Sequence, residues 1–360
     1  MNSTFFHPIV IISSEHVYNR MTKGDEVVIL EPAFDIYPAQ VQMAGGVTKY
    51  VPLRLDSATG IWELNFNELE EAINPRTKIL LLNTPHNPTG KVLSEKELYL
   101  IRGILLRNPH VICVCDEVYE KLVFDGKKHL RLASLPDMWE RTITVSSVGK
   151  TFSVTGWKVG WMYGCEAHIY PVMLANQWVQ FSVSTPTQVA CAAILEEAEA
   201  PYEGFESYYE YVRNLYEKKR NYLVSSLKAA HLHPVVPEGG FFVIADTSAH
   251  NIIPQKYFDE PSPTGQVPVS RDWAFARYLT TEWGVTPIPP SAFYTKETAP
   301  NAANLGTQRN ILELTLKPLD FLIPIPDTSI PSARFAFCKT EEALVEADVR
   351  LRKLGKSFEK

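Results

Sequence analysis

The sequence predicts an α/β protein, with a mostly parallel sheet sandwiched by helices in a large domain and a smaller α+β domain after it. Two observations predict this fold. Strand-like runs alternate with helical patterns over about the first 200 residues, which implies a parallel sheet with both faces covered. Near Pro201 the pattern changes to helices that flank a few strands. A length of 360 residues is enough for two domains, and we place them at residues 1–200 and 201–360.

In the large domain, the expected strands are short apolar runs separated by turns or helical patterns. These runs are residues 27–30, 79–82, 111–115, 142–145 and 159–163. Helical patterns lie between several of them, such as residues 94–107. Ser94 followed by Glu97 forms a capping box, which indicates that a helix begins there.

The small domain is expected to open with one long helix that is rich in Tyr, Lys and Glu. The elements expected in it are a helix at 203–230, a strand at 241–245, a helix at 272–283, a strand at 334–338 and a helix at 341–354. A Pro-rich insertion at about residues 307–332 separates two of these elements. Its stretch 318–331 has a proline or turn-former every few residues, so that no regular element fits it.

Composition excludes several classes of protein. The formal net charge is -6, which gives no electrostatic case for nucleic acid. No apolar run approaches the roughly 20 residues of a membrane span, and residues 1–17 lack the basic start and cleavage site of a signal peptide. The five cysteines fit no zinc or redox spacing. We expect Cys113 and Cys115 to share one strand face as reduced core residues; a metal pair is the alternative.

Three segments are candidates for chemistry. The first, residues 83–90, follows a strand and precedes the capped helix. It contains two X-Pro steps, at Pro85 and Pro88. An irregular loop at the carboxyl end of a strand is where ligands bind in open α/β sheets. Taken alone, the segment could equally be an ordinary turn.

The second segment is residues 115–119, at the end of the apolar run 111–115. The carboxylate of Asp116 would be desolvated there unless a cation were paired with it. Alone, Asp116 could instead be the N-cap of a helix.

The third segment, residues 146–161, contains Lys150 in a loop of small residues between two strands. The triplet from Gly149 to Thr151 suggests a phosphate-binding P-loop, but the glycine required five positions earlier is Thr144, which excludes that motif. A partly buried lysine has a lowered pKa and becomes a nucleophilic amine. Lys158, taken alone, is more typical of a surface charge.

Together these segments resemble fold-type I, class I/II aminotransferases, and they are most similar to the kynurenine aminotransferases, also called cysteine-S-conjugate β-lyases and glutamine transaminases. The resemblance covers residues 22–357 with one interruption. The matching stretches are residues 24–27, 31–37, 83–91, 115–119, 139–144, 149–161, 237–242, 289–293 and 334–337. So many motifs in the same order are far more specific than any one of them.

The resemblance implies pyridoxal 5′-phosphate as the cofactor and gives a role to each matching residue. Lys150 is then the Schiff-base lysine and the base that moves the substrate proton, and Asp116 is the partner of the ring nitrogen. The other implied cofactor contacts are Asn87 and Tyr119 at the ring hydroxyl, Phe34 stacked on the ring, and Ser147 and Lys158 at the phosphate. For the substrate, Arg334 is expected to clamp the carboxylate together with Asn87, and Phe181 to shape the side-chain pocket. No metal is expected.

The resemblance also implies a ping-pong reaction between an amino acid and a 2-oxo acid. The implied donors are kynurenine, glutamine, or aromatic and sulfur amino acids, with β-elimination from cysteine conjugates as a side activity. A homodimer in which the partner chain completes each site is expected. The expected location is the cytoplasm, or the mitochondrion for a form with a different N-terminus. Ser182 stands where some relatives carry histidine.

Two departures from the family pattern affect these expectations. Counting back from Gly24, residues 8–10 replace the Gly-Ala-Tyr-like turn whose backbone N–H groups hold the phosphate, and Pro8 has no N–H to donate. An incomplete phosphate site, first helix and N-terminal arm are therefore expected. The insertion at 307–332 precedes Arg334. Three hypotheses remain: an active aminotransferase, a truncated isoform with weak cofactor binding and little turnover, and a lyase or synthase on the same fold.

Overall fold

The computed structural model describes residues 3–7, 21–56, 58–250, 252–262, 267–295 and 332–357. The chain divides into two compact units. Unit 1 consists of residues 1–217 and 238–240, and unit 2 consists of residues 218–237 and 241–360. The change of domain expected at residue 201 falls instead after Glu217, within helix α8 (Tyr208–Ala229), because one continuous helix carries the chain from unit 1 to unit 2.

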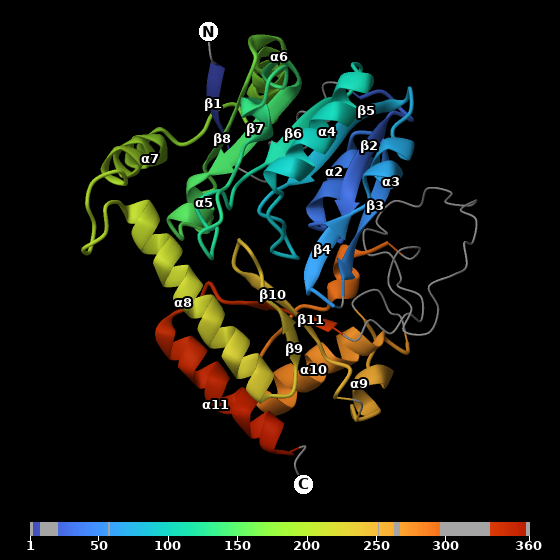
Figure 1. The fold of residues 1–360 in the computed structure, drawn as a ribbon, viewed down its shortest axis with the longest axis vertical. Helices are drawn as coiled ribbons and strands as arrows, with labels where there is room; N and C mark the ends of the chain where they lie inside the picture. Colours follow the sequence, from blue (N-terminus) through green and yellow to red (C-terminus); the bar gives the residue numbers. More distant parts are fainter. Residues whose placement is uncertain are drawn as a thin grey trace. The chain divides into compact units, whose positions relative to one another are not determined.

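Unit 1 contains an eight-stranded sheet of order β1-β8-β7-β6-β5-β2-β3-β4 (Figure 1). The strands are β1 (Ser3–His7), β2 (Glu26–Glu31), β3 (Val47–Asp56), β4 (Ile61–Leu64), β5 (Thr77–Asn83), β6 (Ile112–Asp116), β7 (Thr142–Ser147) and β8 (Gly160–Gly164). The central five, from β7 to β3, are parallel. The outer strands β4, β8 and β1 pair antiparallel. The predicted mostly parallel sheet is confirmed.

The helices of unit 1 follow the strands along the chain. They are α2 (Ile36–Met43), α3 (Phe66–Glu71), α4 (Glu95–Arg107), α5 (Val148–Thr151), α6 (Glu166–Val179), α7 (Thr185–Glu197) and the first part of α8, with 3-10 turns η1 (Leu132–Ser134), η2 (Trp139–Arg141) and η3 (Thr155–Trp157). The predicted capping box is confirmed, since the Ser94 hydroxyl accepts from the Glu97 N–H and the Glu97 carboxylate accepts from the Ser94 N–H.

The central strands are buried on both faces, which explains why their sequences are runs of mostly apolar residues. All six residues of β2 are buried, as are six of the seven in β5. One cluster, which includes Val27, Ile79 and Val114, joins β2, β5 and β6 to α2 and α6. Cys113 and Cys115 are both buried, and their sulfurs lie 3.6 Å apart. They share one strand face, as the sequence predicts.

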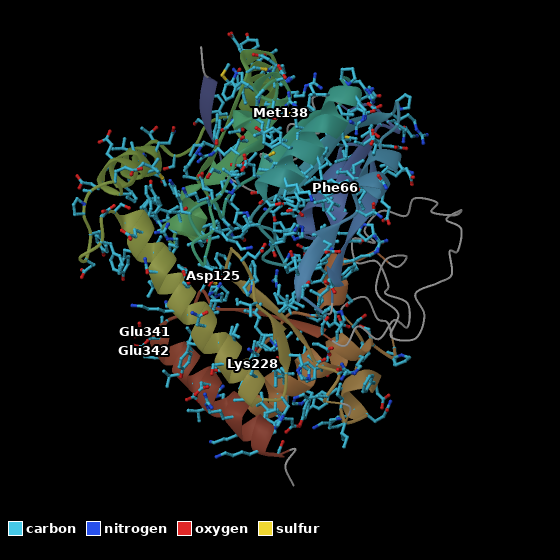
Figure 2. The ribbon with its side chains drawn as sticks, in the orientation of Figure 1. Phe66, Asp125, Met138, Lys228, Glu341 and Glu342 are labelled. Atoms are coloured by element: carbon cyan, nitrogen blue, oxygen red, sulfur yellow. The ribbon has the colours of Figure 1, made fainter. Side chains whose placement is uncertain are left out.

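Residues 238–240 belong to unit 1 because they bond to a turn after β6. The turn has Asp125 and Gly126 at its tip, both with positive φ, and the Lys127 N–H donates to the Phe124 carbonyl at 3.0 Å (Figure 2). The Phe124 N–H donates to the Glu238 carbonyl at 2.9 Å, and Lys127 forms an ion pair with the Glu238 carboxylate. The predicted loop 83–90 is bound to the same segment through Gly90, whose carbonyl accepts from two N–H groups of residues 238–239.

Unit 2 contains a three-stranded antiparallel sheet of order β11-β10-β9. Its elements are the rest of α8, β9 (His233–Val235), β10 (Phe242–Asp246), α9 (Lys256–Asp259), α10 (Arg271–Trp283), η4 (Pro290–Phe293), β11 (Ser332–Ala336) and α11 (Glu341–Ser357). Glu341 and Glu342 lie in the first turn of α11 and Lys228 in the last turn of α8 (Figure 2). Each of these charges complements the helix dipole.

The long helix expected at 203–230 begins later than predicted. Glu203 and Gly204 have positive φ, and Tyr202 and Phe205 bond to each other across them. A turn of this kind cannot be continuous with an α-helix, so α8 starts at Tyr208. The expectation for residues 8–10 lies outside the described residues, as does that for the insertion at 307–332 except for Ser332, which begins β11.

Among the described residues, no helix combines the length and the apolar character that crossing a membrane requires.

Gly239→Ala tests the attachment of residues 238–240. A Cβ at this position would lie 2.8 Å from the Leu122 carbonyl oxygen and 2.8 Å from Cβ of Pro85. Both neighbours are held by rigid backbone, so we expect a loss of about 1–3 kcal/mol in the free energy of unfolding. Chemical denaturation would measure it. Gly156→Ala is the matched control, because nothing lies within 4 Å of the added Cβ. Equal stability of the two variants would contradict the prediction.

Candidate active site

Three parallel strands end together at the edge of the sheet where the candidate residues lie. Asn83 at the end of β5 pairs in register with Asp116 at the end of β6, and Asp116 pairs in turn with Val145 of β7. Ser147 ends β7, and Lys150 follows in α5. The carboxyl edge of parallel strands is the usual ligand site in open α/β sheets. The fold therefore brings the three predicted segments to one place.

Asp116 is a half-buried acid at this edge. Its Oδ2 accepts from the Tyr37 hydroxyl at 2.6 Å, and its Oδ1 accepts from the Val118 N–H at 3.2 Å. Burial raises the pKa of the Asp116 carboxyl, while these hydrogen bonds and the charge of Lys150 oppose the shift. Residue 117 is not helical, so Asp116 is not the N-cap of a helix. This shift in pKa confirms the predicted desolvation of the carboxylate. The neighbouring groups offset the desolvation only in part, so a bound cation would stabilise the ionised form of Asp116.

The loop after β5 is fixed to the Asp116 backbone. The Asn83 side chain donates to the Asp116 carbonyl at 2.9 Å and accepts from the Asn87 N–H at 2.7 Å. Inside the loop, a ring nitrogen of His86 lies 2.8 Å from the Thr89 hydroxyl. Burial, and then the nearby charge of Lys91, lower the pKa of His86 to about 3, so its imidazole is neutral. Asn87 is itself buried and is held in position by its backbone.

Lys150 lies in the short helix α5, not in the loop that the sequence predicts, and it is half-buried. Ser147 caps this helix, because its hydroxyl accepts from the Gly149 N–H at 2.8 Å. The Lys150 ammonium lies 5.8 Å from the centroid of the Tyr119 ring. Tyr119 is buried. The structure thus places the predicted lysine beside Tyr119, and the charge of Lys150 also acts on Asp116.

Phe34 lies two residues before α2, and Tyr37 lies in the first turn of that helix. Phe34 is partly buried, and its ring meets the Tyr37 ring edge-on, with centroids 5.6 Å apart. Tyr37 lies in residues 31–37, one of the stretches that resemble the family, but the sequence alone assigned it no role. No local pattern identifies it, because its hydrogen-bond partner Asp116 lies 79 residues further along the chain.

The remaining predicted residues lie in other settings. Lys158 is exposed, with a left-handed backbone. Phe181 also has positive φ, and 80% of its surface is exposed. Arg334 belongs to unit 2, where its guanidinium lies 4.2 Å from the Phe242 ring centroid and 4.4 Å from that of Phe293. It pairs with Ile244 across β10 and β11.

A charged cluster after Asp116 was not foreseen. Glu117 is fully buried, and its Oε2 lies 2.8 Å from His129 and 3.4 Å from Arg131. Arg131 also pairs with Glu120, which accepts from the Ser146 hydroxyl. The two carboxylates and the imidazole are close enough to bind a metal. Because the Arg131 guanidinium already neutralises both carboxylates, we interpret the cluster as structural.

The model for the aminotransferase class I and II family matches residues 16–303. Kynurenine–oxoglutarate transaminase of Dictyostelium discoideum is 40% identical over 348 residues, which cover 93% of this chain and 72% of that protein. Kynurenine–oxoglutarate transaminase 1 of Mus musculus is 39% identical over 281 residues, which cover 76% of this chain and 65% of that protein. The chain thus spans just under two thirds of the length of the mouse relative.

Solved structures agree with this relationship. Bna3p of Saccharomyces cerevisiae superposes with a TM-score of 0.82 at 30% identity, over 98% of this chain and 76% of that one. N-succinyldiaminopimelate aminotransferase of Mycobacterium tuberculosis superposes with a TM-score of 0.77 at 31% identity, over 98% and 77%. The shared fold, the matching family model and the lysine and aspartate at the sheet edge lead to one conclusion: this chain belongs to the class I and II aminotransferase family.

Proposed function

We propose that this protein is a pyridoxal-phosphate-dependent aminotransferase that moves the amino group of an amino acid to a 2-oxo acid, with kynurenine as a donor. The observation that carries the proposal is the half-buried Asp116 carboxyl, which lies at the carboxyl edge of the sheet and feels the charge of Lys150. The family is generally dependent on pyridoxal phosphate, and the relatives from Dictyostelium and mouse are both named for kynurenine and oxoglutarate.

The residues at the sheet edge fit this cofactor. Burial raises the pKa of Asp116 in spite of two hydrogen bonds and a nearby lysine, so a protonated ring nitrogen would supply the missing positive charge. The residues that would hold the cofactor are Lys150 by its amine, Asp116 at the ring nitrogen, Asn87 and Tyr119 at the ring hydroxyl, Phe34 against the ring, and Ser147 and Lys158 at the phosphate. When bound, the cofactor withdraws electrons from the α-carbon of the substrate.

The side chains then have separate tasks. The Lys150 amine would hold the cofactor and, once displaced, would move the proton at the α-carbon of the substrate. Asp116 would keep the ring nitrogen protonated, and its partly buried surroundings would strengthen that interaction relative to one in water. Arg334 would bind the substrate carboxylate with two parallel hydrogen bonds, since a guanidinium matches that geometry. The same amino group is later returned to a 2-oxo acid, which makes the proposed kinetics ping-pong.

Elimination from cysteine conjugates is proposed as a side activity, because proton removal at the α-carbon is common to both reactions. It would release pyruvate from a conjugate with a leaving group at the β-carbon. Phe181 is proposed to shape the side-chain pocket, and its neighbour Ser182 to alter the choice of donor. Parallel assays of transamination and of pyruvate release on one sample would give the balance of the two activities.

A homodimer is also proposed, on the strength of an exposed apolar stripe along α6. Tyr170, Leu174 and Trp178 are four residues apart and therefore share one face of the helix. Their exposed fractions are 51%, 42% and 85%. Phe181, just beyond the end of α6, is 80% exposed. Large apolar side chains that are gathered on one face typically mark a protein interface.

Lys150→Ala tests the proposed function directly. We expect the variant to lose the visible, borohydride-reducible absorbance band that the parent shows with pyridoxal phosphate, because alanine has no amine. Lys96→Ala, at an exposed site on α4, is the control and should keep the band. Retention of the band in Lys150→Ala would refute the assignment and, with it, the proposed function.

Arg334→Lys tests the carboxylate clamp. Lysine keeps the charge but cannot form the paired hydrogen bonds, so KM for the amino acid and for the oxo acid should each rise by about ten- to one hundredfold. Steady-state kinetics with both substrates would measure this. Arg352→Lys, in an exposed ion pair on α11, should leave both values unchanged. If KM stays the same in Arg334→Lys, Arg334 does not bind the carboxylate.

Trp178→Asp tests the homodimer. A charge in the middle of the stripe should shift the protein from dimer to monomer at micromolar concentration, as measured by sedimentation velocity. Leu100→Asp is the control, because Leu100 is similarly apolar and 42% exposed on α4, away from the stripe. A parent protein that is already monomeric would sink the proposal, as would equal dissociation of the two variants.

A further inference from the structure

Tyr37 contacts two of the groups that are proposed to hold the cofactor ring. Its hydroxyl donates to Asp116 Oδ2 at 2.6 Å. Its ring meets the Phe34 ring at an interplanar angle of 89°, with centroids 5.6 Å apart. Only 4% of the Tyr37 surface is exposed, and the ring belongs to the core cluster that also contains Val27 and Ile29 of β2. The side chain is therefore held in place by the sheet.

The hydrogen bond has a fixed direction. Burial, and then the negative charge of Asp116, raise the pKa of Tyr37 well above its ordinary value. The phenol therefore keeps its proton and acts as a donor over the whole range in which proteins are stable. Since Asp116 Oδ1 accepts from the Val118 N–H, each carboxylate oxygen has a hydrogen-bond donor within the part of the chain that the structure describes. The orientation of the carboxylate is determined by these two bonds, and each oxygen keeps a further lone pair for a ligand.

We infer that Tyr37 is a positioning residue of this site, which orients the Asp116 carboxylate toward the ring nitrogen of the cofactor and braces the ring of Phe34. The inference rests on the proposed function, because it takes Asp116 as the partner of that nitrogen. Tyr37 does not touch the reacting atoms. It acts through Asp116 by hydrogen bonding and through Phe34 by ring packing.

Two consequences follow for a protein that lacks the hydroxyl. The Asp116 carboxylate would lose one of the two hydrogen bonds that orient it, so its hydrogen bond with the ring nitrogen would weaken. It would also lose an interaction that lowers its pKa, so Asp116 would take up a proton at a higher pH. Once an Asp116 oxygen carries a proton, that oxygen can no longer accept a hydrogen bond from the ring nitrogen. The defect should therefore grow as the pH falls.

The experiment compares two cofactors on the intact protein. One is pyridoxal phosphate, and the other is its carbocyclic analogue, in which C–H replaces the ring nitrogen. Both bind through the Lys150 amine and through the phosphate, so those contributions cancel in the ratio of their dissociation constants. The ratio isolates the contact that Asp116 makes with the nitrogen. Absorbance titration would give both constants, without any measurement of turnover.

Tyr37→Phe keeps the ring and removes only the hydroxyl. We expect it to weaken binding of pyridoxal phosphate by about tenfold at neutral pH, more at lower pH, and to leave binding of the analogue within about twofold. Tyr50→Phe, a partly buried tyrosine of β3, is the matched control and should leave the ratio unchanged. Equal losses for both cofactors in Tyr37→Phe would mean that Tyr37 only supports the fold, and would overturn the inference.

Asp116→Asn separates this inference from the proposed function beneath it. It should abolish the preference for pyridoxal phosphate over the analogue. If Asp116→Asn keeps the preference, Asp116 is not the partner of the nitrogen, and the proposed role of the site fails together with the inference. If Asp116→Asn loses the preference and Tyr37→Phe keeps it in full, the inference alone is overturned.

Discussion

One electrostatic constraint organises this site: a carboxylate cannot be buried without partners. β6 lies between two parallel neighbours and ends at the edge of the sheet with Asp116, where burial raises the pKa of the half-buried carboxyl. Neighbouring groups reduce the cost of that burial without removing it. The remaining imbalance makes the edge receptive to a cation. The Asp116 carboxylate makes the fold locally less stable, and the same carboxylate is available to a cation. A local loss of stability of this kind is expected of a functional site.

The next residue, Glu117, also carries a carboxylate into the protein, but its partners are different. Glu117 is fully buried, it faces His129 and Arg131, and Arg131 also pairs with Glu120. Its carboxylate is therefore matched by charge from the protein itself, although burial still raises its pKa. Two adjacent acids thus differ in what surrounds them. Glu117 lies against cationic side chains of the fold itself, whereas Asp116 accepts hydrogen bonds from Tyr37 and Val118, and only Asp116 is proposed to bind a ligand.

Patterns within short segments predicted much of this structure. The strands were visible because central parallel strands are buried on both faces, and α4 because Ser94 and Glu97 form a capping box. The antiparallel course of β8 and the late start of α8 were missed, since strand direction and turns such as Glu203-Gly204 depend on tertiary contacts. Asp116 and Lys150 were found by motif. Tyr37 was not, because its bond to Asp116 joins positions 79 residues apart.

The short segment 238–240 gives this protein an order of assembly. Almost all of unit 1 is synthesised before unit 2 begins, and domains generally fold as units in the order of synthesis. Glu238 and Gly239, however, are made only after the chain has entered unit 2 at Lys218. Until then, the Gly90 carbonyl lacks the N–H groups it accepts from, and Phe124 lacks its acceptor. The loop that carries Asn87 is therefore completed late, when synthesis of the second unit is already under way.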